Sequence, residues 1–185
     1  MTYKQELSRS MCHLAVNRKF RFIGYNVRYG SKANGTLADV AETQLIETPV
    51  AENLIIGIAA GYALKNQPVL AYIERFDFVL NALDALVNHV SKIEIMSQGA
   101  FKPNILVRTL VGNTKRPLFT GLTHTQDFSE GLARLLSFPV VQLTNPNMVF
   151  NEYAAAAASI EHHSTLLVEY RDIYDTECET INTAT

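Results

Sequence analysis

Six short apolar segments alternate with segments of helical period along this chain, and that alternation restricts the fold more than any other feature. The apolar segments do not alternate polar with apolar residues, which indicates strands that are buried on both faces. We expect strands at residues 20–25, 43–46, 69–73, 104–111, 140–143 and 166–169. The sequence therefore predicts an α/β protein, a three-layer α/β/α sandwich with a mainly parallel sheet of about six strands.

The segments between the strands show the 3.6-residue period of helices. We expect helices at residues 3–17, 51–65, 76–96, 128–136 and 147–160. The second of these is rich in small residues, which suggests close packing against a sheet or another helix. Residues 1–173 are predicted to form one domain, and residues 174–185 a polar C-terminal tail that frays.

Composition excludes several classes of function. The net charge is −2, and no cluster of Lys or Arg suggests nucleic acid or an anionic membrane as a partner. The N-terminal segment lacks an apolar signal core, and the run from Leu54 to Leu64 is too short to span a bilayer, which needs roughly 20 apolar residues. Cys12 and Cys178 have no metal-type spacing and read as reduced thiols. We therefore expect a soluble, cytoplasmic protein.

Several well-known site motifs are absent from the sequence. No GxGxxG follows a predicted strand, and no GxxxxGKS/T occurs, so neither a dinucleotide site nor a P-loop is supported. No HExxH and no Cys/His cluster indicates a metal site. The pair His162–His163 lies where a helix gives way to a strand, and a polar turn or helix cap explains it.

Polar residues remain at the ends of three predicted strands, where parallel α/β folds place functional loops. Glu52 follows a proline turn and opens the small-residue helix. Its carboxylate is either a first-turn charge stabilised by the helix dipole or a buried group that shares a proton with a ligand nitrogen.

Spacing alone also leaves the roles of the residues at the other two strand ends undecided. In YIERFDF, residues 72–78, Phe78 suits the core, and Glu74 suits either a solvated turn or a site. In GLTHTQDFSEG, residues 121–131, His124 precedes a short helix and lies either on the surface or beside a site at the sheet edge.

Taken together, these segments resemble one family. IETPVAEN, DALVNHVSKIEIMSQG and GLTHTQ occur in the order and spacing found in the pyrimidine-binding domain of transketolase-like thiamine-diphosphate enzymes. The pattern is most similar to the β subunit of 2-oxoacid dehydrogenase E1 components. That family shows a D-T-P-I-x-E turn, then Q-x-x-N-x-x-x-K-x-x-x-M-S-x-G, then G-x-x-H-S/T-Q. The resemblance covers about residues 3 to 170.

The resemblance implies roles for particular residues. Glu52 matches the glutamate that hydrogen-bonds N1′ of the cofactor's aminopyrimidine, which lets the 4′-nitrogen remove a proton from the thiazolium carbon. Phe78 matches the aromatic residue that stacks on the pyrimidine, and His124 the loop histidine that faces the substrate. Gly57 and Gly61 would allow close approach of the cofactor or of a partner helix.

The chain also departs from the family pattern. Gly24-Tyr25-Asn26 stands where Gly-Glu-Asp is usual at the end of the first strand, and Tyr72 stands where glutamate is common. Glu74 replaces a residue that is usually apolar, and we expect its carboxylate to contact the cofactor instead.

The diphosphate-binding half is not found in this sequence, because no G-D-G is followed by N-x-N-type ligands for Mg²⁺ and diphosphate. Nor is the C-terminal transketolase domain that usually follows. The resemblance therefore implies a separate diphosphate-binding chain that carries the Mg²⁺ ligands, in an α2β2 assembly with the cofactor at the interface.

The expected function is that of one subunit in a split thiamine-diphosphate enzyme. It would act on a 2-oxo acid or a ketose, by decarboxylation or by acyl or ketol transfer, either within a dehydrogenase complex or as a stand-alone enzyme. Two alternatives stay open: a non-catalytic structural or regulatory subunit that keeps the fold, and a flavodoxin-like binding module.

Overall fold

The computed structural model describes residues 1–118 and 121–179, and its centre is one six-stranded parallel sheet. The strand order is β2-β1-β3-β4-β6-β5, and every neighbouring pair is parallel. The strands are β1 (Arg21–Gly24), β2 (Leu45–Glu47), β3 (Val69–Ile73), β4 (Leu106–Val111), β5 (Val140–Gln142) and β6 (Thr165–Tyr170). This confirms the predicted fold class.

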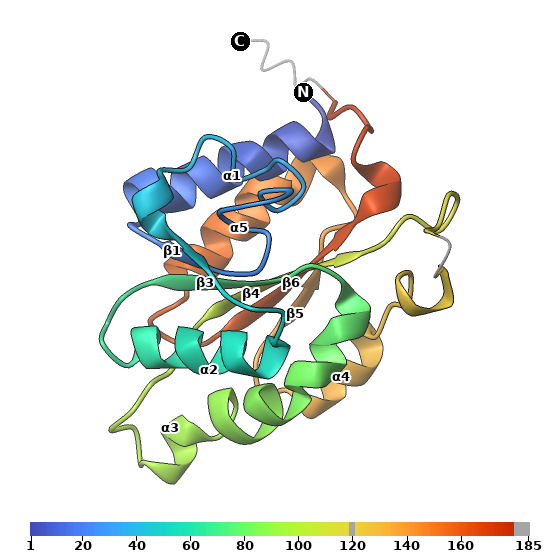
Figure 1. Ribbon diagram of the computed structural model, residues 1–185. Helices are drawn as coiled ribbons and strands as arrows, with labels where there is room; N and C mark the ends of the chain where they lie inside the picture. The colour runs from blue at the N-terminus through green and yellow to red at the C-terminus, as the bar shows by residue number, and fades with distance from the viewer. Residues whose placement is uncertain (119–120, 180–185) are drawn as a thin grey trace.

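Helices cover both faces of the sheet, as Figure 1 shows. The α-helices are α1 (Tyr3–Asn17), α2 (Glu52–Ala63), α3 (Ile93–Met96), α4 (Ser129–Leu135) and α5 (Val149–Ala158). One apolar core lies between α1, α5 and the sheet, and the other lies between α2, α4 and the opposite face. Successive residues of β3 alternate between the two cores: Leu70 and Tyr72 belong to the first, Ala71 and Ile73 to the second. Both faces of the sheet are thus buried, as the unbroken apolar strands indicated.

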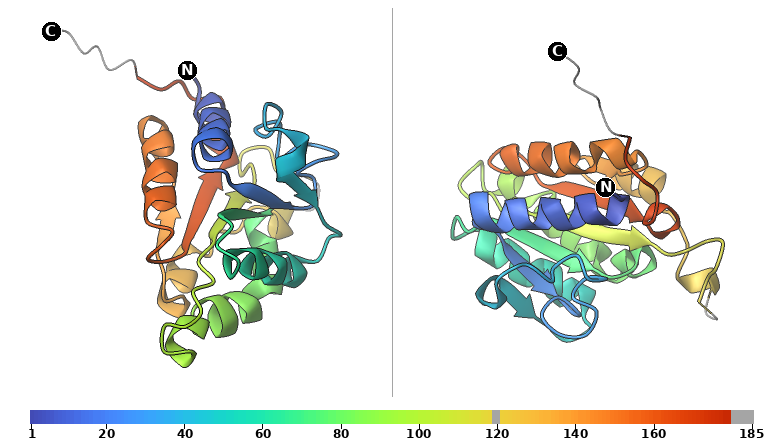
Figure 2. Two further views of the ribbon diagram at one scale, coloured as in Figure 1. Left: turned by 90° about the vertical axis from the view of Figure 1, so that its left-hand side faces the viewer. Right: turned by 90° about the horizontal axis from the view of Figure 1, so that it is seen from above.

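Helix α1 has the bounds predicted from sequence. Thr2 and Gln5 form a capping box at its start, because each side chain bonds the other residue's backbone N–H. Figure 2 shows α1 and α5 side by side on one face of the sheet. None of the helices in the described residues combines the length and the apolar character needed to cross a bilayer.

The single helix predicted for residues 76–96 is wrong in detail. A 3-10 helix η2 (Phe76–Ala82) leads into a π-helix η3 (Ala85–Val90), and only the short α3 is α-helical. The spacing of the buried residues explains why η2 is a 3-10 helix. Phe76, Val79 and Ala82 are fully buried and lie three residues apart, so a helix of three residues per turn points all of them at the core.

The segment after residue 173 also differs from the frayed tail that we expected, as far as the structure describes it. Tyr174 is buried, and the Tyr3 amide donates to the Thr176 carbonyl at 2.9 Å. The Cys178 amide donates to the Met1 carbonyl at 2.7 Å. Residues 174–179 therefore pack against the start of α1, while the rest of the predicted tail lies outside the described residues. The domain boundary at residue 173 stays a prediction.

A buried ion pair joins β4 to β6 inside the first core. Arg108 donates to Glu169 through Nε at 2.6 Å and Nη2 at 3.0 Å, and both side chains have no exposed surface. The hydroxyls of Tyr153 and Tyr174 donate to the same carboxylate, each at 2.7 Å. Glu169 thereby connects two strands, α5 and the segment after β6.

Replacing Glu169 by Gln should destabilise the protein by about 3–5 kcal/mol, because the Arg108 charge would stay buried without its counter-charge. The free energy of unfolding from urea denaturation measures this. The matched control is Glu94→Gln in the exposed Glu94–Lys102 pair, where a cost of at most ~1 kcal/mol is expected. Equal, small costs for both variants would contradict the importance of the buried pair.

Alkaline pH should unfold the protein through its buried tyrosines. Burial, followed by the charge of Glu169, raises the pKa of Tyr3, Tyr153 and Tyr174 above the ordinary value of 10.0. Burial and the Asp127 hydrogen bond raise the pKa of Tyr170 to about 12. The folded state holds these protons more tightly, so their stabilisation is complete below pH 10.0 and is lost progressively above it.

In a pH titration, phenolate absorbance and the loss of helical circular dichroism should therefore rise together above about pH 10. Phenolate formation beyond that of the exposed Tyr29 and Tyr62, with unchanged helical signal, would contradict the prediction.

Candidate functional site

Glu52 is buried at the first turn of α2, just beyond the C-terminal end of β2. Glu52 is 5% exposed, and its Oε2 accepts a hydrogen bond from Asn81 Nδ2 at 3.2 Å. Asn81 belongs to η2, which follows β3. Two strand ends therefore meet at this carboxylate, whereas a simple first-turn charge would be exposed to solvent.

The buried phenol of Tyr25 lies near the carboxylates of Glu74 and Glu52. Glu74 follows β3, and its Oε2 accepts from Asn26 Nδ2 at 3.2 Å. Tyr25, which follows β1, is 6% exposed; its hydroxyl oxygen meets the backbone N–H of Glu74, and no acceptor for its O–H is found within the described residues. Burial, and then the charges of Glu74 and Glu52, raise the pKa of Tyr25, so this phenol stays protonated. A protonated phenol close to two carboxylates is a hydrogen-bond donor ready for a ligand.

The loop after β1 owes its shape to Glu47, the last residue of β2. The carboxylate of Glu47 accepts four backbone N–H groups, those of residues 26–29, at distances from 2.6 to 3.3 Å. This acid therefore holds the backbone that carries Asn26 beside Glu74.

Phe78 of η2 contacts His124. Their rings make an edge-to-face contact with centroids 5.3 Å apart and an interplanar angle of 84°. The His124 loop is fixed to the end of β4, because the Gly112 amide donates to the His124 carbonyl at 3.1 Å. Phe78 is half-buried, so part of its ring remains accessible. The structure thus brings together Phe78 and His124, which lie far apart in sequence.

Asp77, a buried residue of η2, connects this helix to the loop that carries His124. It is 8% exposed, and its Oδ1 accepts from Gln126 Nε2 at 2.8 Å. Its Oδ2 is buried and has no hydrogen-bond partner in the described part of the chain. The His124 loop is therefore attached at two points, through Gly112 and through Gln126.

A cavity of about 210 Å³ adjoins His124 at this edge of the sheet. Arg75, Arg116 and Arg171 line it, from three different strand ends. In residues 1–118 and 121–179, no group of three or more His, Cys, Asp or Glu side chains is arranged to hold a metal ion.

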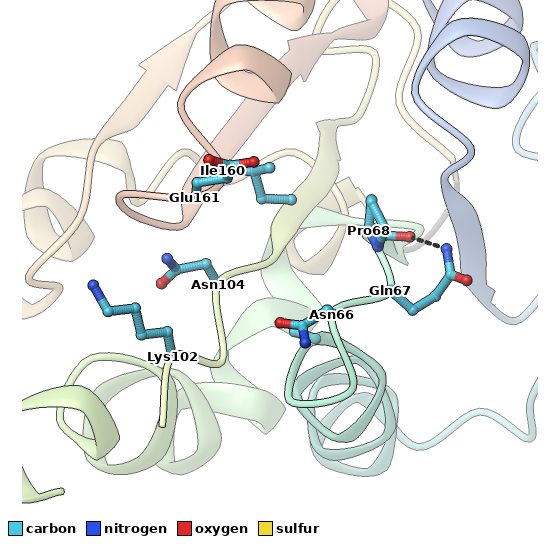
Figure 3. Close-up of a pocket in the computed structure, with 8 residues that line it drawn as sticks. Asn66, Gln67, Pro68, Lys102, Asn104, Ile160 and Glu161 are labelled. Carbon is cyan, nitrogen blue, oxygen red and sulfur yellow. Dashed lines mark hydrogen bonds between the residues drawn. The ribbon is translucent and has the colours of Figure 1, made fainter. Parts of the chain in front are cut away.

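A cavity of about 400 Å³ lies at the opposite end of the sheet (Figure 3). Residues that precede β3, β4 and β6 line it, with Lys102 and Glu161 among them. None of the predicted site residues contributes to it. Since ligands of parallel α/β sheets bind outside the carboxyl ends of the strands, the smaller cavity is the better candidate.

Gly57 does not lie with the other predicted residues. It is on the exposed side of α2, and nothing comes within 4 Å of the position where a Cβ would be. Gly61, one turn later, is equally open. These glycines leave the backbone of α2 uncovered, and a cofactor contact for Gly57 stays a prediction.

Sequence reasoning missed the hydrogen-bonding partners. Asn81 and Gln126 were not assigned roles, and Arg75 and Arg171 were not recognised as neighbours. Their positions directly after strands were a usable signal, because parallel topology brings such ends to one edge.

No protein-family model matches the chain. The chain is 32% identical over 105 residues to a mitochondrial pyruvate dehydrogenase E1 component subunit beta of Saccharomyces cerevisiae, covering 57% of this chain and 28% of that protein. It is 26% identical over 135 residues to the corresponding subunit of Acholeplasma laidlawii, covering 72% and 39%. The chain thus spans well under half the length of these curated relatives.

Two solved structures share the fold. A structure titled as a split gene transketolase, inactive beta4 tetramer, superposes with a TM-score of 0.68 and 15% identity, covering 92% of this chain and 51% of that chain. A thiamine diphosphate-dependent 4-hydroxybenzoylformate decarboxylase of Rhodococcus jostii gives a TM-score of 0.64 and 16% identity, covering 97% and 32%.

These similarities relate the chain to E1 β subunits in sequence and to transketolase-like enzymes in fold. In this fold, the polar side chains of the candidate site gather at the carboxyl ends of β1 to β4, and helix α2 presents Glu52 from its first turn.

Replacing Gly112 by Ala should displace the His124 loop, because the new Cβ would lie 2.0 Å from the His124 carbonyl oxygen. We expect large amide chemical-shift changes through residues 121–127 and lower stability. The control is Gly131→Ala in α4, where nothing lies within 4 Å and a gain of about 0.5–1 kcal/mol is expected. An unchanged loop in the Gly112 variant would show that the close approach does not position His124.

Proposed function

We propose that this chain is the pyrimidine-domain subunit of a split thiamine-diphosphate enzyme, whose active site is completed by a separate diphosphate-binding chain. The observation that supports it most is the buried Glu52 carboxylate, held by Asn81 at the sheet edge where Phe78 and His124 meet. A buried carboxylate with one defined partner keeps a lone pair for a ligand nitrogen.

The residues at this edge fit an aminopyrimidine ring. Glu52 would bond its ring nitrogen, and the accessible part of Phe78 would contact its face. The O–H of Tyr25 and the Glu74 carboxylate would meet its polar edge. When bound, thiamine diphosphate supplies a carbon nucleophile and an electron sink for the substrate. In this proposal Glu52 holds the proton at the cofactor nitrogen, and His124 holds or moves a proton on the substrate side.

A partner chain is part of the proposal, in an α2β2 assembly whose partner supplies the Mg²⁺ and diphosphate ligands. The relatives named as E1 β subunits and the neighbour titled as a split gene transketolase support it. Helix α2 offers a suitable surface. Leu54 and Tyr62 are 46% and 36% exposed on either side of the open Gly57 and Gly61, so another helix could approach the backbone closely.

The reaction class that we propose is decarboxylation of a 2-oxo acid or transfer of its acyl group, with ketol transfer as the other possibility. The similarity to E1 β subunits supports the 2-oxo acid, and the fold shared with the split transketolase supports the ketose. A cytoplasmic location remains a prediction from the sequence.

The second candidate is a non-catalytic subunit that keeps the fold and holds or regulates its partner. Tyr25 and Asn26 favour it, because they replace acidic residues that the family usually carries after the first strand. Their contacts with the Glu74 region weigh against it, since the site has kept acidic groups nearby.

Calorimetric titration of thiamine diphosphate with Mg²⁺ tests the proposal. The chain alone should not bind the cofactor tightly, whereas the chain with a diphosphate-binding partner should. Glu52→Gln in that mixture should abolish most turnover, with a loss of roughly 10²–10⁴-fold as expected for a proton-transfer group.

The matched control is Glu130→Gln, which changes a first-turn glutamate on the exposed side of α4 and should leave turnover unchanged. Full turnover in the Glu52 variant would exclude its catalytic role and favour the non-catalytic subunit. Tight cofactor binding by this chain alone would exclude the split arrangement.

A further inference from the structure

Three consecutive residues at the start of η2 contact three residues of the segment that carries His124. The contacts run in opposite directions along the two segments, and they pair Phe76 with Phe128, Asp77 with Gln126 and Phe78 with His124. The two outer contacts are edge-to-face ring pairs, with centroids 5.9 and 5.3 Å apart. The central contact is a hydrogen bond of 2.8 Å. Together they define one register of the His124 loop against η2.

The central bond restricts this register more than the ring pairs do. Edge-to-face ring pairs are favourable over a range of centroid distances, from about 4.5 to 7 Å. Because Phe128 is itself aromatic, ring contacts alone would also accept a loop shifted along η2. A hydrogen bond weakens steeply when its length or angle changes, so the bond between Asp77 and Gln126 selects one position. Setting a register is a well-attested role for a buried polar group.

Other hydrogen bonds attach the loop to the sheet and leave its place along η2 open. The Gly112 amide donates to the His124 carbonyl at 3.1 Å, and the Tyr170 hydroxyl donates to Asp127 Oδ2 at 2.7 Å. These donors come from the ends of β4 and β6. They keep the loop at the sheet edge, whereas Asp77 relates it to the helix that carries Phe78.

Asp77 is a poor choice for stability at its position. It is 8% exposed, and its neighbours Phe76 and Val79 have no exposed surface. Its Oδ2 finds no donor among the residues that the structure describes. A buried carboxylate oxygen without a donor lowers stability, and an apolar side chain of similar size would avoid that cost. Residues that break a packing rule in this way are expected where function requires them.

We propose that Asp77 is a positioning residue, which fixes the register of the loop through Gln126 and so holds the His124 ring beside Phe78. Its effect on turnover rests on the proposed function, in which Phe78 contacts the cofactor and His124 acts on the substrate side. Its hold on the loop does not. A small displacement of a group that transfers a proton lowers the rate strongly, so the register matters for turnover.

The first test uses the full chain alone and follows nuclear Overhauser effects between the ring protons of Phe78 and His124. Asp77→Leu removes the acceptor and should weaken these effects strongly, and Gln126→Leu should do the same. Asp77→Asn keeps an acceptor for Gln126 and should preserve them. Unchanged ring contacts in Asp77→Leu would overturn the proposal.

Thermal unfolding separates positioning from a general structural role. Asp77→Leu should leave the midpoint unchanged or higher, because it removes the donorless oxygen and leaves the exposed amide of Gln126 to water. The matched control is Ser137→Ala at the amino-terminal end of the sheet, which removes a bond of 3.0 Å to the Ser91 carbonyl. It should lower the midpoint and keep the ring contact.

Two outcomes of this comparison would overturn the proposal. One is a midpoint that falls further in Asp77→Leu than in Ser137→Ala, which would make Asp77 a structural residue. The other is a ring contact that weakens equally in both variants, since the loss would then follow from general loosening of the fold.

The assembled enzyme tests the effect on catalysis. Asp77→Leu should lower kcat roughly tenfold to a hundredfold and leave KM within about twofold, because the misplaced group acts in the transition state. Asp77→Asn should recover most of the loss. A loss in Asp77→Asn as large as in Asp77→Leu would overturn positioning in favour of proton transfer by Asp77 itself. Unchanged kcat in Asp77→Leu would overturn the link to turnover.

The ring contact is measured without cofactor or partner. It can therefore be confirmed where cofactor binding by the mixed chains fails, and it can fail where that binding succeeds. The two proposals are thus tested separately.

Discussion

The carboxylate of Glu169 is the point on which the packing of this protein depends. It accepts four hydrogen bonds, two from Arg108 and one each from Tyr153 and Tyr174, with none of the four side chains more than 1% exposed. Such a buried network often adds less stability than well-packed apolar residues would, but it tolerates few alternative arrangements, since any displaced member leaves a buried charge or donor without a partner. Here it sets the relative positions of β4, β6 and α5.

The network around Glu169 also affects the edge of the sheet that carries the candidate site. Val111 pairs with Tyr170 at the ends of β4 and β6, directly before Gly112 and Arg171. Gly112 bonds the His124 loop, and Arg171 lines the adjoining cavity. The paired ends of β4 and β6 therefore lie one residue before Gly112 and Arg171, which reach the His124 loop and the cavity beside it. This explains how a loop as long as the one after β4 can present a histidine at a fixed place.

Much of the fold could be predicted because its signals are local. Apolar strands such as Val69–Ile73 and the capped helix Tyr3–Asn17 were found with their observed bounds. The segment after β3 was misjudged, because three-residue and 3.6-residue spacings of buried side chains are hard to tell apart over a few turns.

The candidate site was only partly predictable. The resemblance pointed to Glu52, Phe78 and His124, but spacing alone left each of them ambiguous. The resemblance did not predict contacts between segments that are distant in sequence. Examples are Asn81 with Glu52, and Arg75 near Arg171. Those contacts depend on strand order, and many orders are compatible with the same string of strands and helices.

Glu47 and Glu52, on either side of the turn at Pro49, have different roles. Glu47 is occupied by four backbone amides of residues 26–29, while Glu52 has a single side-chain partner. An acid whose oxygens already hold a main chain cannot turn to a ligand without loosening the loop it supports. Redesign of this protein for new substrates should therefore leave position 47 untouched.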